Sequence, residues 1–127
     1  MFWPGEHRAG PAMSDQALLD YLIAAENAWL ATLVEAAVAP ASAAAELDEL
    51  VTAADLATVA AGSERDGNPV TALVGLLRDR AGADTARWLH RGLTSQDVLD
   101  VSMMLRLRGA FTTLAGAGGQ QVHALIL

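Results

Sequence analysis

The fold is decided by SDQALLDYLIAAENAWLATLVEAAVAP, residues 14–40. Ser14 is a favourable N-cap residue, and Asp15 follows it in the first turn, where negative charge stabilises a helix. Apolar residues then recur at helical spacing in two adjacent lines: Leu18, Leu22, Trp29 and Leu33 in one, and Leu19, Ile23, Leu30 and Val34 in the other. Pro40 ends the pattern because it cannot continue a helix. The segment predicts one long helix over residues 14–39, with an apolar face wider than a surface helix requires.

Two shorter helical pieces are expected in the alanine-rich segment that follows. Ser42 is placed to cap a helix that carries Leu47, Leu50 and Val51. Thr52 and Asp55 have the spacing of a capping box, so a turn or helix restarts there and runs to Ala61. Residues 62–67 are polar and glycine-bounded, which predicts a break.

The second half of the chain predicts three further helices. Asn68 and Pro69 combine an N-cap with a proline at the first helical position, and Gly82 ends that helix. Residues 84–90 form a short helical piece that Gly92 stops. The expected buried residues of the helix after Asn68 are Val70, Leu73, Val74 and Leu77, and those of the last helix are Val98, Val101, Leu105 and Leu107.

The last helix should weaken after Arg108. Four glycines follow, at positions 109, 116, 118 and 119, and each costs a helix about 1 kcal/mol relative to alanine. No alternating strand pattern occurs, so the fold class is all-α. We divide the chain into an irregular lead-in over residues 1–13, a helical domain over 14–93, and the start of a truncated or divergent helix over 94–127.

Composition excludes several functional classes. The net charge is −7 and the arginines are scattered, whereas a nucleic-acid-binding protein needs a basic patch. The chain has no cysteine, which removes disulfides and thiolate chemistry. Residues 1–11 lack the apolar core of a signal peptide, and residues 28–38 fall short of the ~20 needed to span a membrane. We therefore expect a cytoplasmic protein with no membrane or nucleic-acid partner.

Two polar segments at helix starts are the candidates for binding chemistry. The first, residues 67–70, is Gly-Asn-Pro-Val; the second, residues 90–98, is His-Arg-Gly-Leu-Thr-Ser-Gln-Asp-Val. Both fit plain helix capping, by Asn68 and by Thr94 or Ser95. Both also fit a carboxylate site, because the free amides and the positive dipole end of a helix attract anions. His90 fits a proton shuttle, a substrate donor or a packed core histidine.

The second segment resembles a conserved stretch of the fumarase/aspartase superfamily. Adenylosuccinate lyases carry a similar His-x-Gly-x-Thr-Ser-x-Asp-Val run. Gln96, together with Gly-Asn-Pro-Val upstream, is more similar to the 3-carboxy-cis,cis-muconate cycloisomerases, because adenylosuccinate lyases have a histidine-containing segment at the upstream position. The resemblance covers roughly residues 12–108. It implies the helical N-terminal domain of the L-aspartase-like fold, followed by the start of its central helical bundle.

The resemblance also implies a site. Asn68, Thr94 and Ser95 match positions that contact substrate carboxylates, and His90 matches a residue near the substrate. Gln96 and Asp97 belong to the same loop, with Asp97 bracing it. The implied reaction is the lactonisation of a muconate tricarboxylate in the protocatechuate branch of the β-ketoadipate pathway. The resemblance implies no metal or organic cofactor, a small polycarboxylate substrate and a homotetramer.

The chain departs from the family in length and in two motifs. The Thr-His segment and the Gly-Ser-Ser-x-Met-Pro loop, which holds the catalytic serine, do not occur in this sequence. We therefore expect no catalytic residue within the 127 residues and no activity from this chain alone. A truncated gene, a shifted reading frame and divergence all fit these departures.

Two alternatives to a cycloisomerase-like enzyme follow from the same residues. One is another lyase of the superfamily, such as a relative of adenylosuccinate lyase, against which Asn68 argues. The other is a non-catalytic helical protein that uses its alanine-rich faces for self-association. The DNA downstream of Leu127 separates these alternatives, because a continuing frame with the missing motifs would identify an enzyme.

Overall fold

The computed structural model describes residues 10–126, with side chains described from residue 10 to residue 116. Within these residues the chain forms helices and short 3-10 turns and no strands, so the all-α prediction is confirmed. The elements in chain order are η1 (Gly10–Met13), α2 (Asp15–Glu35), η2 (Ala41–Ala43), η3 (Leu47–Glu49), η4 (Ala53–Asp55), α3 (Leu56–Asp66), α4 (Pro69–Arg80), α5 (Ala83–Trp88) and α6 (Ser95–Ile126).

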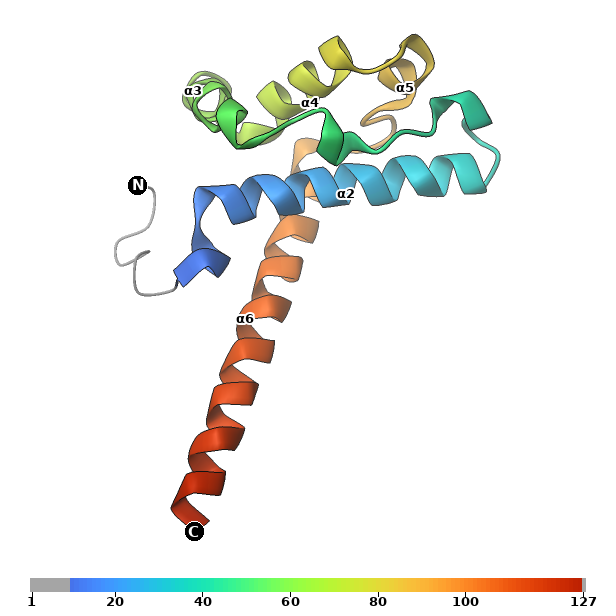
Figure 1. Ribbon diagram of the computed structural model, residues 1–127. Coiled ribbons are helices and arrows are strands. Elements are labelled where there is room, and N and C mark those ends of the chain that lie inside the picture. Colours follow the sequence, from blue (N-terminus) through green and yellow to red (C-terminus); the bar gives the residue numbers. More distant parts are fainter. Residues whose placement is uncertain (1–9, 127) are drawn as a thin grey trace.

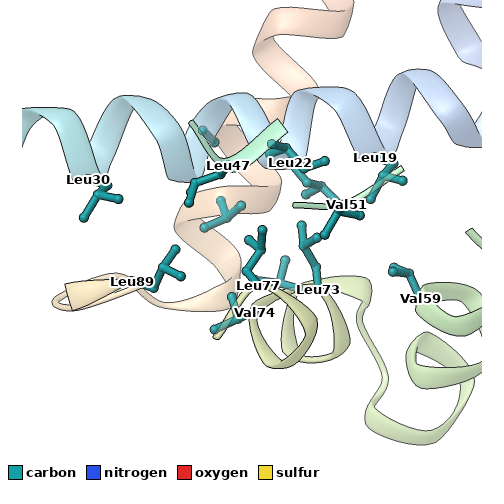
Figure 2. Packing of buried hydrophobic residues seen from close by; sticks show 14 of the residues in the cluster. Leu19, Leu22, Leu30, Leu47, Val51, Val59, Leu73, Val74, Leu77 and Leu89 are labelled. Carbon is teal, nitrogen blue, oxygen red and sulfur yellow. The ribbon is translucent and has the colours of Figure 1, made fainter. Parts of the chain in front are cut away.

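The helices form a small layered body from which one helix projects. Figure 1 shows α3, α4 and α5 together on one side of α2, while α6 crosses α2 and runs away on the other side. The core lies between α2 and the α3–α5 layer, where Leu22 faces Leu73 and Leu77 (Figure 2). Apolar burial of this kind is the main stabilising contribution to the fold.

The long N-terminal helix is confirmed, although it ends four residues earlier than predicted. Ser14 caps α2 by accepting a hydrogen bond from the amide of Ala17 at 3.1 Å. At the other end Ala37 adopts a left-handed φ of 55°, and the amides of Val38 and Ala39 both donate to the carbonyl of Leu33. This hydrogen-bonded turn ends the helix before Pro40 is reached.

Both apolar lines of α2 contribute to the core. The buried members are Leu19, Leu22, Ile23, Leu30 and Leu33, while Leu18, Trp29 and Val34 are partly buried and pack against them. By length and composition alone α2 is also apolar enough to cross a membrane, and it is the one such helix among the described residues. In this fold its apolar face packs against α3, α4 and α6 instead.

The helix predicted after Ser42 is wrong. The segment contains two 3-10 turns, η2 and η3, separated by extended residues. The hydroxyl of Ser42 donates to Asp84 instead of capping a helix, and the amide of Leu47 donates to the Asn27 side chain of α2 at 2.9 Å. These tertiary hydrogen bonds tie the segment to α5 at Ser42 and to α2 at Leu47, and they override its alanine-rich helix propensity.

The capping box of Thr52 and Asp55 is confirmed, whereas the break predicted over residues 62–67 is confined to its last residue. Helix α3 continues through Gly62 to Asp66 and ends at Gly67, which has a φ of 78°. Gly62 allows α3 and α4 to pack closely, because a Cβ atom at this position would collide with Ala72 of α4. Glycine inside a helix therefore marks a helix contact here, and only Gly67 marks a helix end.

The helix that begins at Pro69 buries all four predicted residues, Val70, Leu73, Val74 and Leu77. For α6 the prediction fails in two respects. The helix runs on past Gly109 and Gly116 as far as Ile126. Of its predicted core residues only Val98 is buried, whereas Val101 and Leu107 are exposed and Leu105 is half-buried. The face that α6 turns inward carries Ser102 and Arg106 below Val98.

Candidate functional site

The turn over residues 89–93 joins α5 to α6 and carries His90. Two of its residues have left-handed backbone angles, His90 with a φ of 58° and Gly92 with a φ of 86°. Glycine adopts this conformation freely, whereas a non-glycine residue does so rarely. His90 is therefore held in place by contacts from elsewhere in the fold.

Three side chains from two helices hold the 89–93 turn. From α2, the indole Nε1 of Trp29 donates to the carbonyl of Arg91 at 2.8 Å, and Oε1 of Glu26 lies 2.6 Å from Nδ1 of His90. From α4, the guanidinium of Arg78 donates to the carbonyl of Leu89 at 2.9 Å. The turn is thus anchored at three successive residues, Leu89, His90 and Arg91, by side chains from distant parts of the sequence.

The contribution of Glu26 escaped the sequence analysis. Its side chain has no solvent exposure, while that of His90 is 17% exposed. One signal could have found it: Glu26 falls on the buried line of α2, between Ile23 and Leu30. A carboxylate on an apolar helix face needs a partner, because burying an isolated charge is costly.

The start of α6 is closed by a capping box. The amide and hydroxyl of Thr94 both donate to Oδ2 of Asp97, each at 2.7 Å, and the amide of Asp97 donates back to the Thr94 hydroxyl at 3.3 Å. The backbone hydrogen bond from Thr94, its hydroxyl and the nearby His90 hold the pKa of Asp97 below its usual value. Of the two residues predicted as possible caps, Thr94 and Ser95, Thr94 forms the cap, and Asp97 braces it.

The polar side chains next to this cap differ in whether they already make hydrogen bonds. Gln96 is exposed and its amide donates to Asp100 one turn later, at 2.7 Å. Ser95 is half-buried, and its hydroxyl takes part in no hydrogen bond within residues 10–116. Of the two hydroxyls predicted to bind a carboxylate, the one on Thr94 is engaged in the cap and the one on Ser95 is available.

Asn68 caps α4, as its position predicts. Its Oδ1 accepts from the amides of Val70 at 3.0 Å and Thr71 at 3.3 Å, and its Nδ2 donates to the carbonyl of Asp66. Among the described residues no hydrogen bond joins Asn68 to residues 90–97, although α4 and α6 pack together. The structure thus groups His90 with Thr94, Ser95, Gln96 and Asp97, and the meeting of this group with Asn68 stays a prediction.

One hollow of about 360 Å³ lies outside this group of residues. It lies between α2 and α3, next to Pro69, and its walls are mainly apolar. None of the predicted site residues lines it. Among the described residues, no group of three or more histidine, aspartate or glutamate side chains is arranged to hold a metal ion.

The chain resembles several known proteins in sequence, among them two cycloisomerases and a lyase. A 3-carboxy-cis,cis-muconate cycloisomerase from Bradyrhizobium diazoefficiens is 38% identical over 104 residues, which are 78% of this chain and 22% of that enzyme. A nitrosuccinate lyase from Streptomyces davaonensis is 36% identical over the same length and shares. A 3-carboxy-cis,cis-muconate cycloisomerase from Acinetobacter baylyi is 34% identical over 105 residues, 76% of this chain and 23% of the enzyme.

The chain spans less than a quarter of the length of these relatives. No protein-family model and no solved structure matches it. The similarity therefore rests on most of this chain and on a small part of each enzyme.

Proposed function

Since this chain is homologous to enzymes of the fumarase/aspartase superfamily, we propose that it forms the carboxylate-binding part of a 3-carboxy-cis,cis-muconate cycloisomerase-like enzyme. Two of the three relatives carry that name. The names of all three denote a carboxylate substrate or product, which is the chemistry that a helix start with hydroxyl and amide groups recognises.

The observation that carries the proposal is the anchored segment from His90 to Asp97. Side chains of α2 and α4 hold its turn, and the capping box between Thr94 and Asp97 fixes the start of α6. The first amides of α6 have no acceptor within the helix, and the Ser95 hydroxyl lies beside them. A rigid set of neutral donors of this kind suits a carboxylate, because little ordering is required when the ligand binds.

In the proposed reaction, one carboxylate of a muconate tricarboxylate adds across a double bond to form a lactone, and a proton is added at carbon. Negative charge grows on the carboxylate next to the carbanion, where placed donors stabilise it. Within this chain Ser95 and Gln96 supply donors, and Asn68 joins them from the start of α4. Thr94 and Asp97 brace these donors through the cap of α6. The proton donor comes from outside residues 10–126. We propose no metal or organic cofactor.

The proposed protein acts in the cytoplasm as a homo-oligomer. Six of the seven exposed large apolar residues among the described residues lie on α6, at positions 101, 103, 104, 107, 111 and 114. Positions 104, 107, 111 and 114 follow the 3-4-3 spacing of a helix that packs against other helices. The β-ketoadipate pathway is the proposed metabolic setting.

The test is a titration with propane-1,2,3-tricarboxylate, followed at the amide resonances of Ser95 and Gln96. We expect saturable shifts at these amides, and a Ser95→Ala variant that binds at least fivefold more weakly, as for a lost hydrogen bond to a charged group. Ser63→Ala, on α3 and away from the 90–97 segment, is the matched control. Shifts absent at millimolar ligand would leave helix capping as the full role of the segment.

A second candidate is a lyase acting on a different carboxylate. The similarity to a nitrosuccinate lyase favours this candidate over a relative of adenylosuccinate lyase. Adenylosuccinate lyases have a histidine-containing segment at the position where this chain has Asn68. A third candidate, a non-catalytic self-associating protein, is favoured by the exposed face of α6. The downstream reading frame discriminates among them, because only an enzyme requires the missing Thr-His and Gly-Ser-Ser segments.

A further inference from the structure

The buried carboxylate of Glu26 has one hydrogen-bonding partner among the described residues, the imidazole of His90. Its second oxygen, Oε2, is buried and accepts no hydrogen bond there. Leucine would fill the same position on the apolar face of α2 without the cost of burying a charge. Glu26 is therefore poorly explained by packing and well explained by what it does to His90.

The contact selects one nitrogen of the ring. Nδ1 lies 2.6 Å from Oε1 of Glu26, a distance typical of a charge-assisted hydrogen bond. An ionised carboxylate can only accept a hydrogen bond, so Nδ1 carries the hydrogen when Glu26 is ionised. In the neutral ring, Nε2 then keeps its lone pair. The second nitrogen of a histidine is commonly specified in this way by the bond that the first one makes.

The backbone supports the same assignment. His90 is held at a φ of 58°, and the carbonyl groups of Leu89 and Arg91 on either side of it are bound by Arg78 and Trp29. The ring thus has little freedom to turn away from α2. Because the Glu26 side chain is fully buried and that of His90 is 17% exposed, the exposed part of the pair belongs to the imidazole.

We propose that Glu26 is a positioning residue, whose buried carboxylate fixes His90 as the Nδ1–H tautomer and leaves Nε2 as the nitrogen that contacts ligand. The proposal rests on the proposed function, because it takes residues 90–97 as the carboxylate-binding segment. Asp97 at the start of α6 is a second charged group near His90. The arginines next to the turn are bound elsewhere: Arg78 donates to the carbonyl of Leu89, and Arg91 lies 4.6 Å from the centre of the Trp88 ring. Of these and Glu26, only the Glu26 carboxylate contacts Nδ1.

The tautomer is measured directly by two-bond ¹H–¹⁵N correlation of the imidazole at a pH where the ring is neutral. The chain has three histidines, and a His90→Gln variant identifies the signals of His90. We expect a pyrrole-type Nδ1 and a pyridine-type Nε2 in the unmodified chain. Glu26→Gln should keep this pattern because its amide oxygen still accepts a hydrogen bond, whereas Glu26→Leu should lose it.

Trp29→Phe is the matched control for general loosening of the turn. It removes another α2 hydrogen bond to the same turn and leaves the contact between Glu26 and His90 in place. We expect the tautomer of His90 to stay unchanged in this variant. An Nε2–H tautomer in the unmodified chain would overturn the proposal, since Glu26 would then be a protonated acid donating to Nδ1. The same tautomer in Glu26→Leu as in the unmodified chain would also overturn it.

The same variants are then titrated with propane-1,2,3-tricarboxylate. We expect Glu26→Leu to bind at least fivefold more weakly and Glu26→Gln to recover most of the affinity. Equal affinity in the unmodified chain and in Glu26→Leu would contradict the positioning role. A failure of the unmodified chain to bind would contradict the proposed function, whereas the tautomer measurement contains no ligand and judges the role of Glu26 separately.

Discussion

Gly62 of α3 and Ala72 of α4 lie so close together that a Cβ atom built on Gly62 would be 2.3 Å from the Cβ of Ala72. Real side chains do not approach to this distance, so the two helices pack at a separation that only glycine permits. This contact sets the spacing of the α3–α4 pair, which in turn covers the core beneath Leu73 and Val59.

Gly62→Ala should therefore destabilise the fold. We expect the free energy of unfolding to fall by about 1–3 kcal/mol, as for overpacked cores, despite the better helix propensity of alanine. Gly75→Ala is the control: it also lies within a helix, a Cβ there meets nothing within 4 Å, and stability should rise by about 0.4–1 kcal/mol. Chemical denaturation measures both, and equal effects would show that the helices can separate.

Single substitutions can distinguish the capping role of Thr94 from the role of its neighbour Ser95. Thr94→Ala removes a hydroxyl that both donates to and accepts from Asp97, and should lower the free energy of unfolding by about 1 kcal/mol. Ser95→Ala should change it by less than about 0.5 kcal/mol, because its hydroxyl makes no hydrogen bond within the described residues. Denaturant midpoints of the two variants make the comparison, and a reversed order would place the cap at Ser95.

The Asp55–Arg80 ion pair should make stability depend on acidity. Arg80 donates to both oxygens of Asp55, at 2.8 and 2.6 Å, and this hydrogen bonding holds the carboxyl pKa of Asp55 far below its ordinary value of 3.8. A carboxyl whose pKa is lower in the folded state stabilises the fold above its ordinary pKa. That contribution is lost as the pH falls toward the folded value.

Arg80→Met should accordingly lower stability more at pH 7 than at pH 2.5. Arg65→Met is the control, because Arg65 pairs with its sequence neighbour Asp66 and is 73% exposed, and exposed ion pairs contribute little to stability. Thermal unfolding across this pH range gives the answer. A loss caused by Arg80→Met that is constant with pH would assign its effect to the bond from Arg80 to the carbonyl of Leu50.

Arg106 has a buried guanidinium group that is not fully hydrogen-bonded within the described part of the fold. It is 3% exposed, and its Nε and Nη2 atoms have no hydrogen-bond partner among the described residues. Replacing a buried, unmatched charge with an apolar side chain is often neutral or stabilising by about 1–4 kcal/mol. We expect Arg106→Met to unfold at the same or a higher temperature. A loss of several kcal/mol would reveal a partner for the guanidinium outside residues 10–116.

The exposed face of α6 should drive self-association. Phe111 and Leu114 are each 66% exposed, and large apolar patches are unusual on a monomer. We expect a Phe111→Glu, Leu114→Lys variant to sediment as a smaller species than the unmodified chain at tens of micromolar. Val38→Glu is the control, since Val38 is 57% exposed but lies outside α6. A monomer before any change would contradict the expectation.

The parts of the fold that could be predicted are those fixed by neighbours in sequence. Ser14, Asn68 and Thr94 cap their helices as their residue types and positions indicate, and the four apolar residues of α4 are buried as a group. The errors come from tertiary contacts. Ser42 reaches Asp84 across the fold, and Gly62 serves a helix contact that no local pattern reveals.

The candidate site shows the same division. Its capping atoms were predictable, whereas the anchoring of the 89–93 turn by Glu26, Trp29 and Arg78 was not, because these residues lie 11 to 64 positions away. The inward face of α6 was also missed, since Ser102 and Arg106 are polar residues in buried positions. Only a charged residue within an apolar stripe, as at Glu26, gave a usable sign.

The anchoring of the 89–93 turn to α2 has a consequence for the order of folding. The hydrogen bonds that join Trp29 to Arg91 and His90 to Glu26 close loops of 62 and 64 residues. Closing a long loop costs entropy before any contact is gained. The local elements, the α3–α4 pair among them, have no such delay. We therefore expect the turn that bears His90 to dock last, so that substitutions at Trp29 accelerate unfolding and leave the refolding rate nearly unchanged.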